Sequence, residues 1–331
     1  MNLNLLGSTD LVVSHVGIGL AALGRPGYIN IGHAEDLERN YDNEAMEARA
    51  HEMLDEAYKN GVRYFDAARS YGRAEEYLGN WLRAREIPPE TVTVGSKWGY
   101  TYTAEWKVDA AAHEIKEHSL SVLQKQFEES RFNLGEYLNL YQIHSATMES
   151  GVLKNKSVLG ELARLKSEGI AIGLSVSGFR QKEVIHQSAA QLVDGVRLFD
   201  SVQATWNLLE QSAGEALSDA KKMGIGIIIK EPLANGRLTI RNREPLFADR
   251  LNALNREAKR LKTTIDGLAI AAVLAQPWAD VVLSGAARVD HLRSNLRAVD
   301  VMWDQEAESA LDWIKESPES YWEERKGLSW N

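Results

Sequence analysis

The stretch GIGIIIK, residues 224–230, consists of apolar residues and glycine up to its terminal lysine. A second run, DVVLSG at 280–285, is similarly apolar. Strands that are buried on both faces, as in a parallel sheet covered by helices, have this continuous apolar character, whereas strands with one face in water alternate. The two runs therefore predict strands of a parallel sheet that is enclosed by helices.

Six more short runs with strand character alternate with helical stretches. The eight predicted strands are residues 16–21, 63–66, 91–97, 138–144, 171–177, 201–205, 224–230 and 280–285. Eight strand–helix repeats without a linker are typical of a closed parallel (β/α)8 barrel, the TIM barrel fold. We therefore predict an α/β fold with one barrel domain over residues 1–331.

Helices are predicted around these strands. The first, about 47–58, ends at Asn60-Gly61, which is a typical C-terminal cap. The other predicted helical regions are roughly 107–131, 157–169, 212–224 and 250–264. LNLL and DLVVS, around Gly7-Ser8, predict an N-terminal β-hairpin that closes the bottom of the barrel, and residues 304–316 predict an extra C-terminal helix.

The composition excludes several kinds of site. The chain has 331 residues and no cysteine, which removes disulfides, thiolate zinc sites, iron–sulfur ligation and cysteine nucleophiles. Its net charge of −9 opposes binding to a phosphate backbone, so no nucleic-acid partner is expected. The N-terminus lacks the pattern of a secretory signal, and no apolar run approaches the roughly 20 residues that span a bilayer. A cytoplasmic protein without a membrane partner is expected, and the oligomeric state stays open.

Polar side chains stand where the predicted strands end. Asp66, Lys97 and His144 end the second, third and fourth strands, and Tyr71 lies in the loop after Asp66. The later strand ends carry Ser175, Gln203 and the pair Lys230-Glu231. In a (β/α)8 barrel the carboxyl ends of the strands converge on one face, where active sites lie. Residues more than 150 positions apart are therefore expected to meet in one pocket.

The combination of tyrosine, lysine, aspartate and histidine suits carbonyl chemistry. Reduction of a carbonyl requires a hydride at carbon and a proton at oxygen, and a phenol, with a reference pKa of about 10, is a weak acid at pH 7. A nearby ammonium lowers that pKa, and Lys97 is expected to do so for Tyr71. Asp66 is expected to pair with Lys97 and offset its buried charge. His144 is expected to hydrogen-bond the carbonyl oxygen and orient it.

The motif FDAARSYGRAEEYLG at 65–79 resembles the signature of the aldo-keto reductase family, in which Asp and Tyr are separated by four residues and followed by Gly and Glu. Asp66, Tyr71, Lys97 and His144 match the family's catalytic four, and the resemblance runs from about residue 10 to about residue 300. It implies an enzyme that reduces an aldehyde or ketone to an alcohol. Further motifs follow in the family's order and spacing: SK at 96–97, LYQIH at 140–144, IGLS at 172–175, VQ…N at 202–207 and SGAARVDHLRSN at 284–295.

The resemblance implies NADPH bound across the barrel mouth without a Rossmann domain, and no G-x-G-x-x-G lies between a predicted strand and helix. It implies that Ser175 and Gln203 hydrogen-bond the nicotinamide carboxamide. Gly285 and Arg288 occupy the positions at which related enzymes bind the 2′-phosphate, and Asn295 occupies the position at which they contact adenine. Arginine binds phosphate in a bidentate manner, which favours NADPH over NADH.

The nicotinamide side departs from the family pattern. The family often has Asn directly after the serine, where this chain has Val176 followed by Ser177. The seventh strand of the family usually ends in an aromatic residue that stacks on the nicotinamide, whereas this chain has Lys230, with Leu233 still matching. The lysine stem can cover one ring face, and its charge can reach a phosphate. Arg237, Arg241 and Arg243 form a basic cluster that is either a pyrophosphate clamp or a charged surface loop.

Aromatic residues near the predicted mouth indicate the substrate pocket. Tyr28, in a long loop after the first strand, Trp98, directly after Lys97, and Trp206 are the expected substrate contacts. Other aromatic residues in the long loops and the tail are Tyr100, Tyr102, Trp106, Trp322 and Trp330. An aromatic wall suits a ring or an apolar aldehyde, and a sugar also stacks on tryptophan. The substrate is therefore expected only to be a small carbonyl or alcohol compound.

Two alternatives stay open. The same residues would serve an NAD(P)-dependent alcohol or sugar dehydrogenase, because the catalyst acts in both directions. Some members of the family are cofactor-sensing regulatory subunits with little turnover, although the presence of all four catalytic residues disfavours that reading. A metal-dependent hydrolase is disfavoured, and no metal is expected, because His144 has no second histidine at a strand end and no H-x-H or H-E-x-x-H motif occurs.

Overall fold

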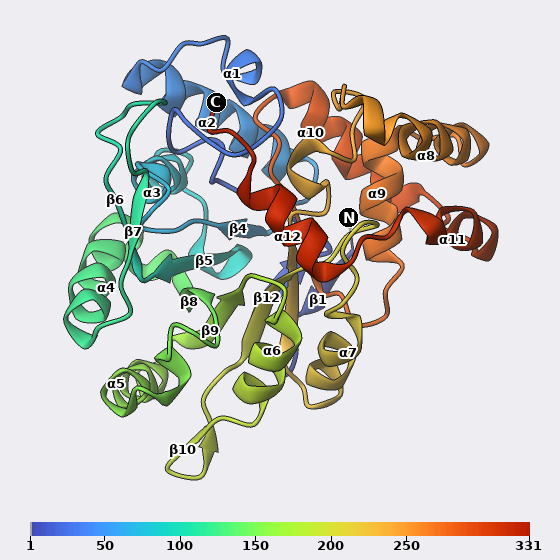
Figure 1. Cartoon of the computed structure of the whole chain (residues 1–331). Coiled ribbons are helices and arrows are strands. Elements are labelled where there is room, and N and C mark those ends of the chain that lie inside the picture. The colour runs from blue at the N-terminus through green and yellow to red at the C-terminus, as the bar shows by residue number, and fades with distance from the viewer. Residues whose placement is uncertain (1) are drawn as a thin grey trace.

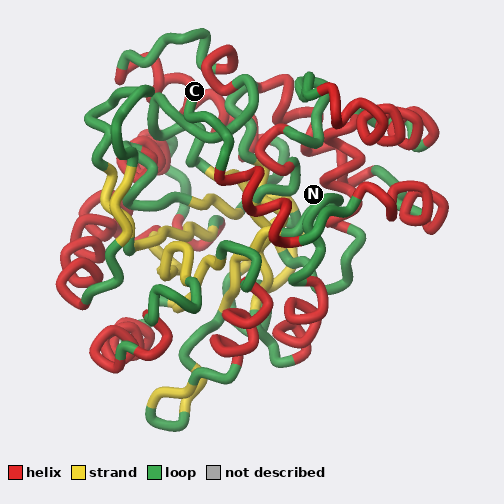
Figure 2. The backbone as a smooth tube through the Cα atoms, in the orientation of Figure 1, coloured by secondary structure: helices red, strands yellow, loops and turns green. Residues whose placement is uncertain are grey.

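The computed structural model describes residues 2–331 and contains a closed barrel of parallel strands. In chain order the strands are β3 (Val16–Gly19), β4 (Tyr64–Asp66), β5 (Thr93–Trp98), β8 (Leu138–Ala146), β9 (Ala171–Val176), β12 (Ser201–Thr205), β13 (Gly226–Lys230) and β14 (Val281–Ser284). Val282 of β14 pairs with Val16 of β3, which closes the barrel. Figure 2 shows the strands at the centre with helices around them. The predicted fold class and all eight predicted strands are confirmed.

Helices return the chain on the outside of the barrel. They are α2 (Asn43–Lys59), α3 (Ala74–Ala84), α4 (Leu120–Leu134), α5 (Lys156–Ser167), α6 (Gln181–Ala189), α7 (Gly214–Lys222), α8 (Ala248–Arg260), α9 (Ile265–Leu274) and α10 (Val289–Leu296). The Asp42 side chain caps the start of α2, and Asn60 and Gly61, with a φ of 88°, end it as predicted. Within residues 2–331, no helix combines the length and the apolar character that a bilayer span requires.

The predicted N-terminal hairpin is present at the bottom of the barrel. β1 (Leu3–Leu5) pairs antiparallel with β2 (Val12–Ser14). Gly7, with a φ of 58°, lies against the start of β13, and a Cβ there would be 2.3 Å from Gly226 N, so only glycine fits. The hairpin and the barrel share the buried residues Leu6, Val13, Tyr64, Leu140 and Ile228. This end is therefore sealed, and the opposite end is left for the site.

The predicted helix over 107–131 is wrong in its first half. β6 (Tyr100–Tyr102) pairs antiparallel with β7 (Glu114–Lys116), and α4 begins only after Ser119, whose Oγ accepts from Val122 N at 3.3 Å. The alanine-rich segment favours a helix locally, but its pairing within this hairpin overrides that weak preference. The hairpin carries Tyr100 and Glu114 to the barrel mouth.

The C-terminal segment, residues 317–331, crosses the barrel mouth. The extra helix predicted over 304–316 is present as α11 (Gln305–Leu311), and α12 (Pro318–Lys326) follows it. Figure 1 shows α12, in red, in front of the barrel strands. At its end, Asn331 exchanges two backbone hydrogen bonds with Tyr28, of 3.1 and 3.2 Å. The segment is thus tied to the loop that follows β3.

Arg237 holds the C-terminal segment through ion pairs with Glu316, which directly precedes the segment, and with Glu324 of α12. Its buried guanidinium donates to both carboxylate oxygens of Glu316 at 3.0 and 2.6 Å and to Glu324 at 3.0 Å. A guanidinium committed to two carboxylates cannot serve a phosphate at the same time. Of the basic cluster in this loop, Arg237 is therefore a structural residue.

Candidate active site

Four polar side chains meet at one side of the barrel mouth. Lys97, fully buried at the end of β5, pairs with Asp66, and its Nζ donates to Ala67 O at 3.0 Å and to Tyr71 Oη at 3.3 Å. His144 Nε2, near the end of β8, lies 3.4 Å from the same phenol oxygen. The structure thus brings together the four residues that the sequence places near neighbouring strand ends.

A tight turn after β4 holds Tyr71 over the mouth. Tyr71 N donates to Ala68 O at 3.0 Å, and Gly72, with a φ of 61°, takes a backbone conformation that favours glycine. Arg73 N then donates to Gly24 O at 2.8 Å. A Cβ at Gly24 would lie 2.2 Å from Tyr71 O, so this close approach also requires glycine. Local backbone chemistry therefore fixes the phenol relative to β3 and β4.

Asp66 is held as a buried carboxylate by donors from several strands. Its Oδ1 accepts from Gln203 Nε2 at 2.9 Å, from Tyr64 Oη at 3.2 Å and from Gln142 Nε2 at 3.4 Å. Lys97 occupies Oδ2. A buried charge is tolerated when it is both paired and hydrogen-bonded. Asp66 therefore holds Lys97 in place, as predicted, and the ion pair leaves little net charge at this point.

The pKa of Tyr71 is raised well above 10, so the net lowering that the sequence predicts is wrong. Burial of the phenol is the main cause, the charge of Asp66 adds to it, and the Arg25 guanidinium opposes it. The ammonium of Lys97 lies close to the phenol, but Asp66 largely offsets its charge. The phenol therefore holds its proton at neutral pH, and it releases that proton only to an oxygen on which negative charge develops.

The pKa of His144 is lowered well below 6.5 because the ring is buried and faces Lys97 and Arg25. A neutral imidazole has one donor nitrogen and one acceptor nitrogen. Nδ1 lies 3.4 Å from Ser70 Oγ, and Nε2 faces Tyr71. With its proton on Nε2, His144 can donate to an oxygen that is placed next to the phenol.

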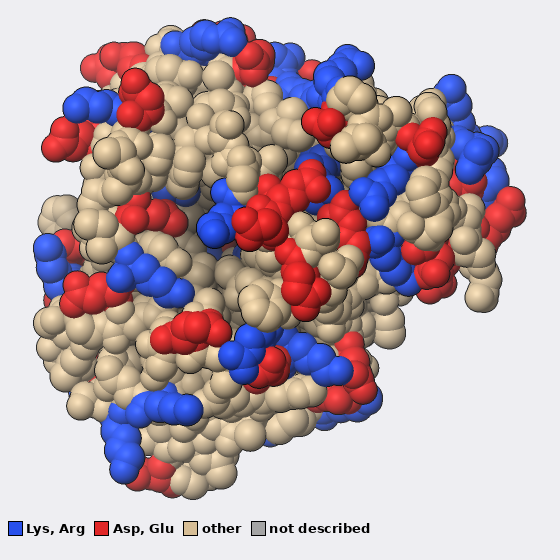
Figure 3. All heavy atoms as spheres, in the orientation of Figure 1, with Lys and Arg blue, Asp and Glu red and all other residues tan. Residues whose placement is uncertain are grey.

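A cavity of about 940 Å³ opens beside Tyr71 and His144. Figure 3 shows a hollow on this face with acidic and basic side chains around it. Six of the expected cofactor and substrate residues line the cavity: Tyr28, Gln203, Lys230, Leu233, Gly285 and Asn295. Within residues 2–331, no group of three or more His, Asp or Glu side chains is arranged to hold a metal ion.

Trp98 and Trp206 do not reach the cavity, so their expected contacts with a substrate are not supported. Successive side chains of a strand point to opposite faces, and since Lys97 points into the mouth, Trp98 points outward. Trp98 is fully buried in the core and packs edge-on against His118, with ring centroids 5.5 Å apart. Trp206, also in the core, packs edge-on against Trp278 with ring centroids 5.6 Å apart.

Ser175 and Arg288 also lie away from the cavity wall. Ser175 Oγ, almost completely buried, accepts from Ser145 N at 2.8 Å, and Ser145 and Ser177 line the cavity in its place. The Arg288 guanidinium is exposed and pairs with Asp290 at 3.0 Å. Arg241 lines the cavity instead, where its Nη1 donates to Asp36 at 2.8 Å.

Arg25 lines the cavity, although the sequence does not mark it as a site residue. Its guanidinium lies 5.4 Å from the Tyr71 ring centroid and 4.8 Å from that of Trp330, and Nη1 donates to Glu114 at 2.9 Å. Its only sequence signal is its place in the long loop after β3. The partner Glu114 lies in the hairpin that was expected to be helical, so this pair could not be anticipated.

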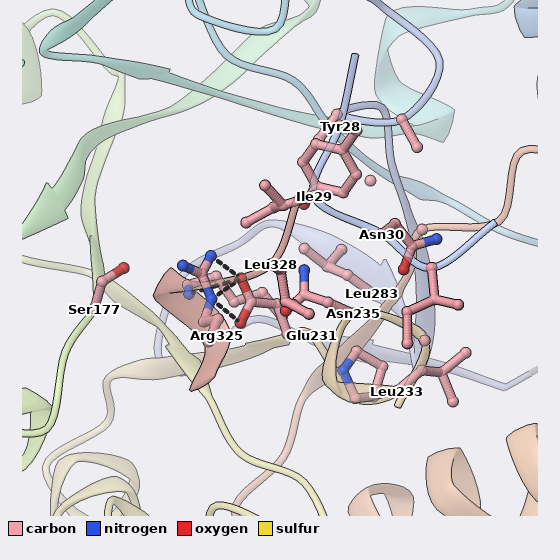
Figure 4. Close-up of a pocket in the computed structure, with 18 of the residues that line it drawn as sticks. Tyr28, Ile29, Asn30, Ser177, Glu231, Leu233, Asn235, Leu283, Arg325 and Leu328 are labelled. Atoms are coloured by element: carbon pink, nitrogen blue, oxygen red, sulfur yellow. Dashed lines mark hydrogen bonds and ion pairs between the residues drawn. The ribbon is translucent and has the colours of Figure 1, made fainter. Parts of the chain in front are cut away.

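The end of β13 carries a charged triad. Glu231, in a left-handed conformation with a φ of 56°, accepts from Arg325 Nε at 2.8 and 3.0 Å, and Figure 4 shows this pair at the cavity. Lys230 Nζ donates to Thr205 Oγ1 at 2.7 Å. Burial, together with Arg325 and Lys97, lowers the pKa of Lys230 to about 8, although Glu231 opposes this shift. The pKa of Glu231 is lowered to about 2 because Arg325 and Lys230 outweigh its burial.

Comparisons with known proteins agree with this geometry. The model of the Aldo/keto reductase family matches residues 16–316. An uncharacterized oxidoreductase of Bacillus subtilis is 26% identical over 89% of this chain and 90% of its own length. An NADH-specific methylglyoxal reductase of Escherichia coli is 25% identical over 89% and 93%. The solved structure of an aldo-keto reductase from Bacillus halodurans, in its holo form, has a TM-score of 0.73 and 20% identity over 96% of this chain and 97% of that one.

Proposed function

Because the chain belongs to the aldo/keto reductase family, we propose that it reduces an aldehyde or ketone to the alcohol with NADPH. The proposal is carried by the Tyr71 phenol, whose oxygen lies 3.3 Å from Lys97 Nζ and 3.4 Å from His144 Nε2. Such a phenol can protonate the oxygen of a carbonyl bound beside it.

The four residues take separate parts in this reaction. His144, neutral and with Nε2 toward the cavity, donates to the carbonyl oxygen and orients it next to Tyr71. Tyr71 passes its phenol proton to that oxygen as negative charge develops there. The Lys97 ammonium, 3.3 Å away, stabilises the phenolate that remains. Asp66 keeps Lys97 in place, which is a positioning role.

A nicotinamide cofactor, when bound, supplies the hydride to the carbonyl carbon. The cavity lies near the upper end of the usual range of roughly 300–1,000 Å³ for small-molecule sites, so it can hold a large ligand. Asn235 Oδ1 is buried in its wall without a hydrogen-bond partner, and such an atom is ready to accept from a ligand amide or hydroxyl. Gln203, Asn295 and Lys230 supply further polar contacts.

The choice of NADPH over NADH is tested at Arg288. Arg288 releases Asp290 at little cost because exposed ion pairs contribute at most about 1 kcal/mol. If it then binds the 2′-phosphate, Arg288→Ala lowers the ratio of NADPH to NADH affinity roughly tenfold, as expected for a lost charge-assisted contact. The measurement is a fluorescence titration with each cofactor.

Arg241→Ala and Arg256→Ala are the companion variants. Arg241 lines the cavity. If the ratio of NADPH to NADH affinity falls only in Arg241→Ala, then Arg241 and not Arg288 binds the 2′-phosphate. Arg256, an exposed arginine on α8, is the control and should leave the ratio unchanged. An unchanged affinity ratio in both Arg288→Ala and Arg241→Ala would contradict a 2′-phosphate site, and NADH would become the proposed cofactor.

The reaction itself is tested by following NADPH absorbance with a panel of aldehydes, ketones and sugars. Turnover of at least one carbonyl class is expected. Tight NADPH binding without any turnover would instead support a cofactor-sensing subunit. The absence of cysteine and the net charge of −9 further support a small-molecule enzyme of the cytoplasm, without a nucleic-acid partner.

A further inference from the structure

Lys230 brings a positive charge to the cavity that no carboxylate fully offsets. Its ion-pair partner is Glu231, at 3.7 Å from Nζ, beyond hydrogen-bond range. The Glu231 carboxylate is already bound by Arg325 through three hydrogen bonds, of 2.5, 2.8 and 3.0 Å. One carboxylate therefore serves two cations, and the triad has a surplus positive charge.

The neighbouring charges at the cavity floor are matched. Lys97 pairs with Asp66, and Arg25 pairs with Glu114 at 2.9 Å. His144 is neutral because its pKa lies well below 6.5. Among these ion pairs, the surplus charge therefore belongs to the triad, and Lys230 is the member of the triad that ends a barrel strand.

In the proposed reaction, the hydride donor must lie in the cavity that Lys230 and Tyr71 both line. Reacting atoms have to approach to roughly 3–3.5 Å, and the carbonyl oxygen is placed by Tyr71 and His144. Lys230, Tyr71 and His144 line the same cavity. A nicotinamide ring is cationic when oxidised and neutral when reduced, so an ammonium in its wall repels only the oxidised form.

We propose that Lys230 makes this site bind reduced nicotinamide cofactor in preference to the oxidised form, so that the site is loaded with the form that carbonyl reduction consumes. The inference rests on the proposed function. In the reaction a C–H bond of the reduced cofactor breaks, and its electron pair forms the new C–H bond at the carbonyl carbon. The proton of Tyr71 goes to the carbonyl oxygen, and the oxidised ring left behind carries a positive charge that Lys230 opposes, which favours its release.

The preference depends on pH, because burial, Arg325 and Lys97 lower the pKa of Lys230 to about 8. The groups that face it are Glu231 on its own strand end, Arg325 on α12, Lys97 on β5 and His144 on β8. Glu231, with a pKa of about 2, and His144 do not titrate between pH 7 and pH 9. The discrimination is therefore present below pH 8 and is lost as the pH rises above it.

The test measures the affinities of NADPH and NADP⁺ by quenching of tryptophan fluorescence at pH 7 and pH 9. For the wild type at pH 7, NADPH should bind at least about tenfold more tightly than NADP⁺, as expected for one partly compensated charge. Lys230→Met should tighten NADP⁺ binding about tenfold and leave NADPH binding within about threefold. Raising the pH from 7 to 9 should also tighten NADP⁺ binding to the wild type, because Lys230 then loses its charge.

Two variants control for charge and for packing. Lys230→Arg keeps the charge and should keep the preference at both pH values, because arginine does not lose its proton. Lys222→Met removes an exposed lysine of α7 and should change neither affinity.

Equal weakening of both cofactor forms in Lys230→Met would overturn the inference, since Lys230 would then bind a group common to both, such as the pyrophosphate. An unchanged ratio with tight binding would also overturn it and leave the proposed function intact. Failure of the wild type to bind either form would overturn the proposed function and this inference with it.

Discussion

Replacing Tyr71 by phenylalanine is expected to lower kcat/KM for carbonyl reduction by about 10³-fold, within the range of roughly 10² to 10⁴ for loss of a general acid. The substitution removes the one hydroxyl that lies within reach of both Lys97 Nζ and His144 Nε2. The ring itself is retained, so the packing against His144, with centroids 5.4 Å apart, should persist. Cofactor affinity should therefore change little while kcat falls.

Tyr102→Phe is the matched control for this experiment. The Tyr102 hydroxyl is buried without a hydrogen-bond partner, and Tyr102 does not line the cavity. Its removal should leave kcat/KM within about twofold, because no partner is left unsatisfied. Equal activity of Tyr71→Phe and the wild type would remove Tyr71 as the proton donor and leave His144 as the remaining candidate.

The second large effect is expected from Lys97→Met. This change leaves the buried Asp66 carboxylate without its cation, and breaking a buried ion pair in this way costs about 3–5 kcal/mol of unfolding free energy. It also removes the ammonium that stabilises the Tyr71 phenolate, so kcat should fall together with stability. Urea unfolding and steady-state kinetics measure the two effects separately.

The double variant Lys97→Met/Asp66→Asn distinguishes the effect of Lys97 on stability from its effect on catalysis. The introduced asparagine side chain would keep an oxygen that accepts from Gln203 and Tyr64, and no uncompensated charge would remain. Because replacing a buried ion pair by neutral groups is often close to neutral, most of the stability should return. Activity should stay low. Recovery of activity in the double variant would show that Lys97 acts only by compensating Asp66.

The barrel and the residues at its mouth could be predicted from the sequence because both depend on local patterns. Apolar runs such as 224–230 are strands buried on both faces, and their polar ends must converge once the barrel closes. The contact of Tyr71 with Lys97 and His144 follows from that convergence. The Gly7 turn and the Asn60-Gly61 helix end are equally local, since they depend on backbone conformation.

Features of the cavity that depend on pairing between distant segments could not be predicted in this way. Residues 107–118 have the composition of a helix, but the β6–β7 hairpin forms there. Trp98 was expected at the substrate and lies in the core, because its neighbour Lys97 occupies the inward face of β5. α12 closes over the mouth and places Arg325 on Glu231, which leaves Lys230 without a carboxylate of its own.

The pKa of Tyr71 shows most clearly the difference between what the sequence determines and what the tertiary structure determines. The sequence by itself determined which ionisable groups meet, because strand ends in a closed barrel have no other place to go. Only the tertiary structure decided the direction of the shift. Burial and the charge of Asp66 outweigh the cations around the phenol, and burial is a property of the whole fold rather than of any one motif.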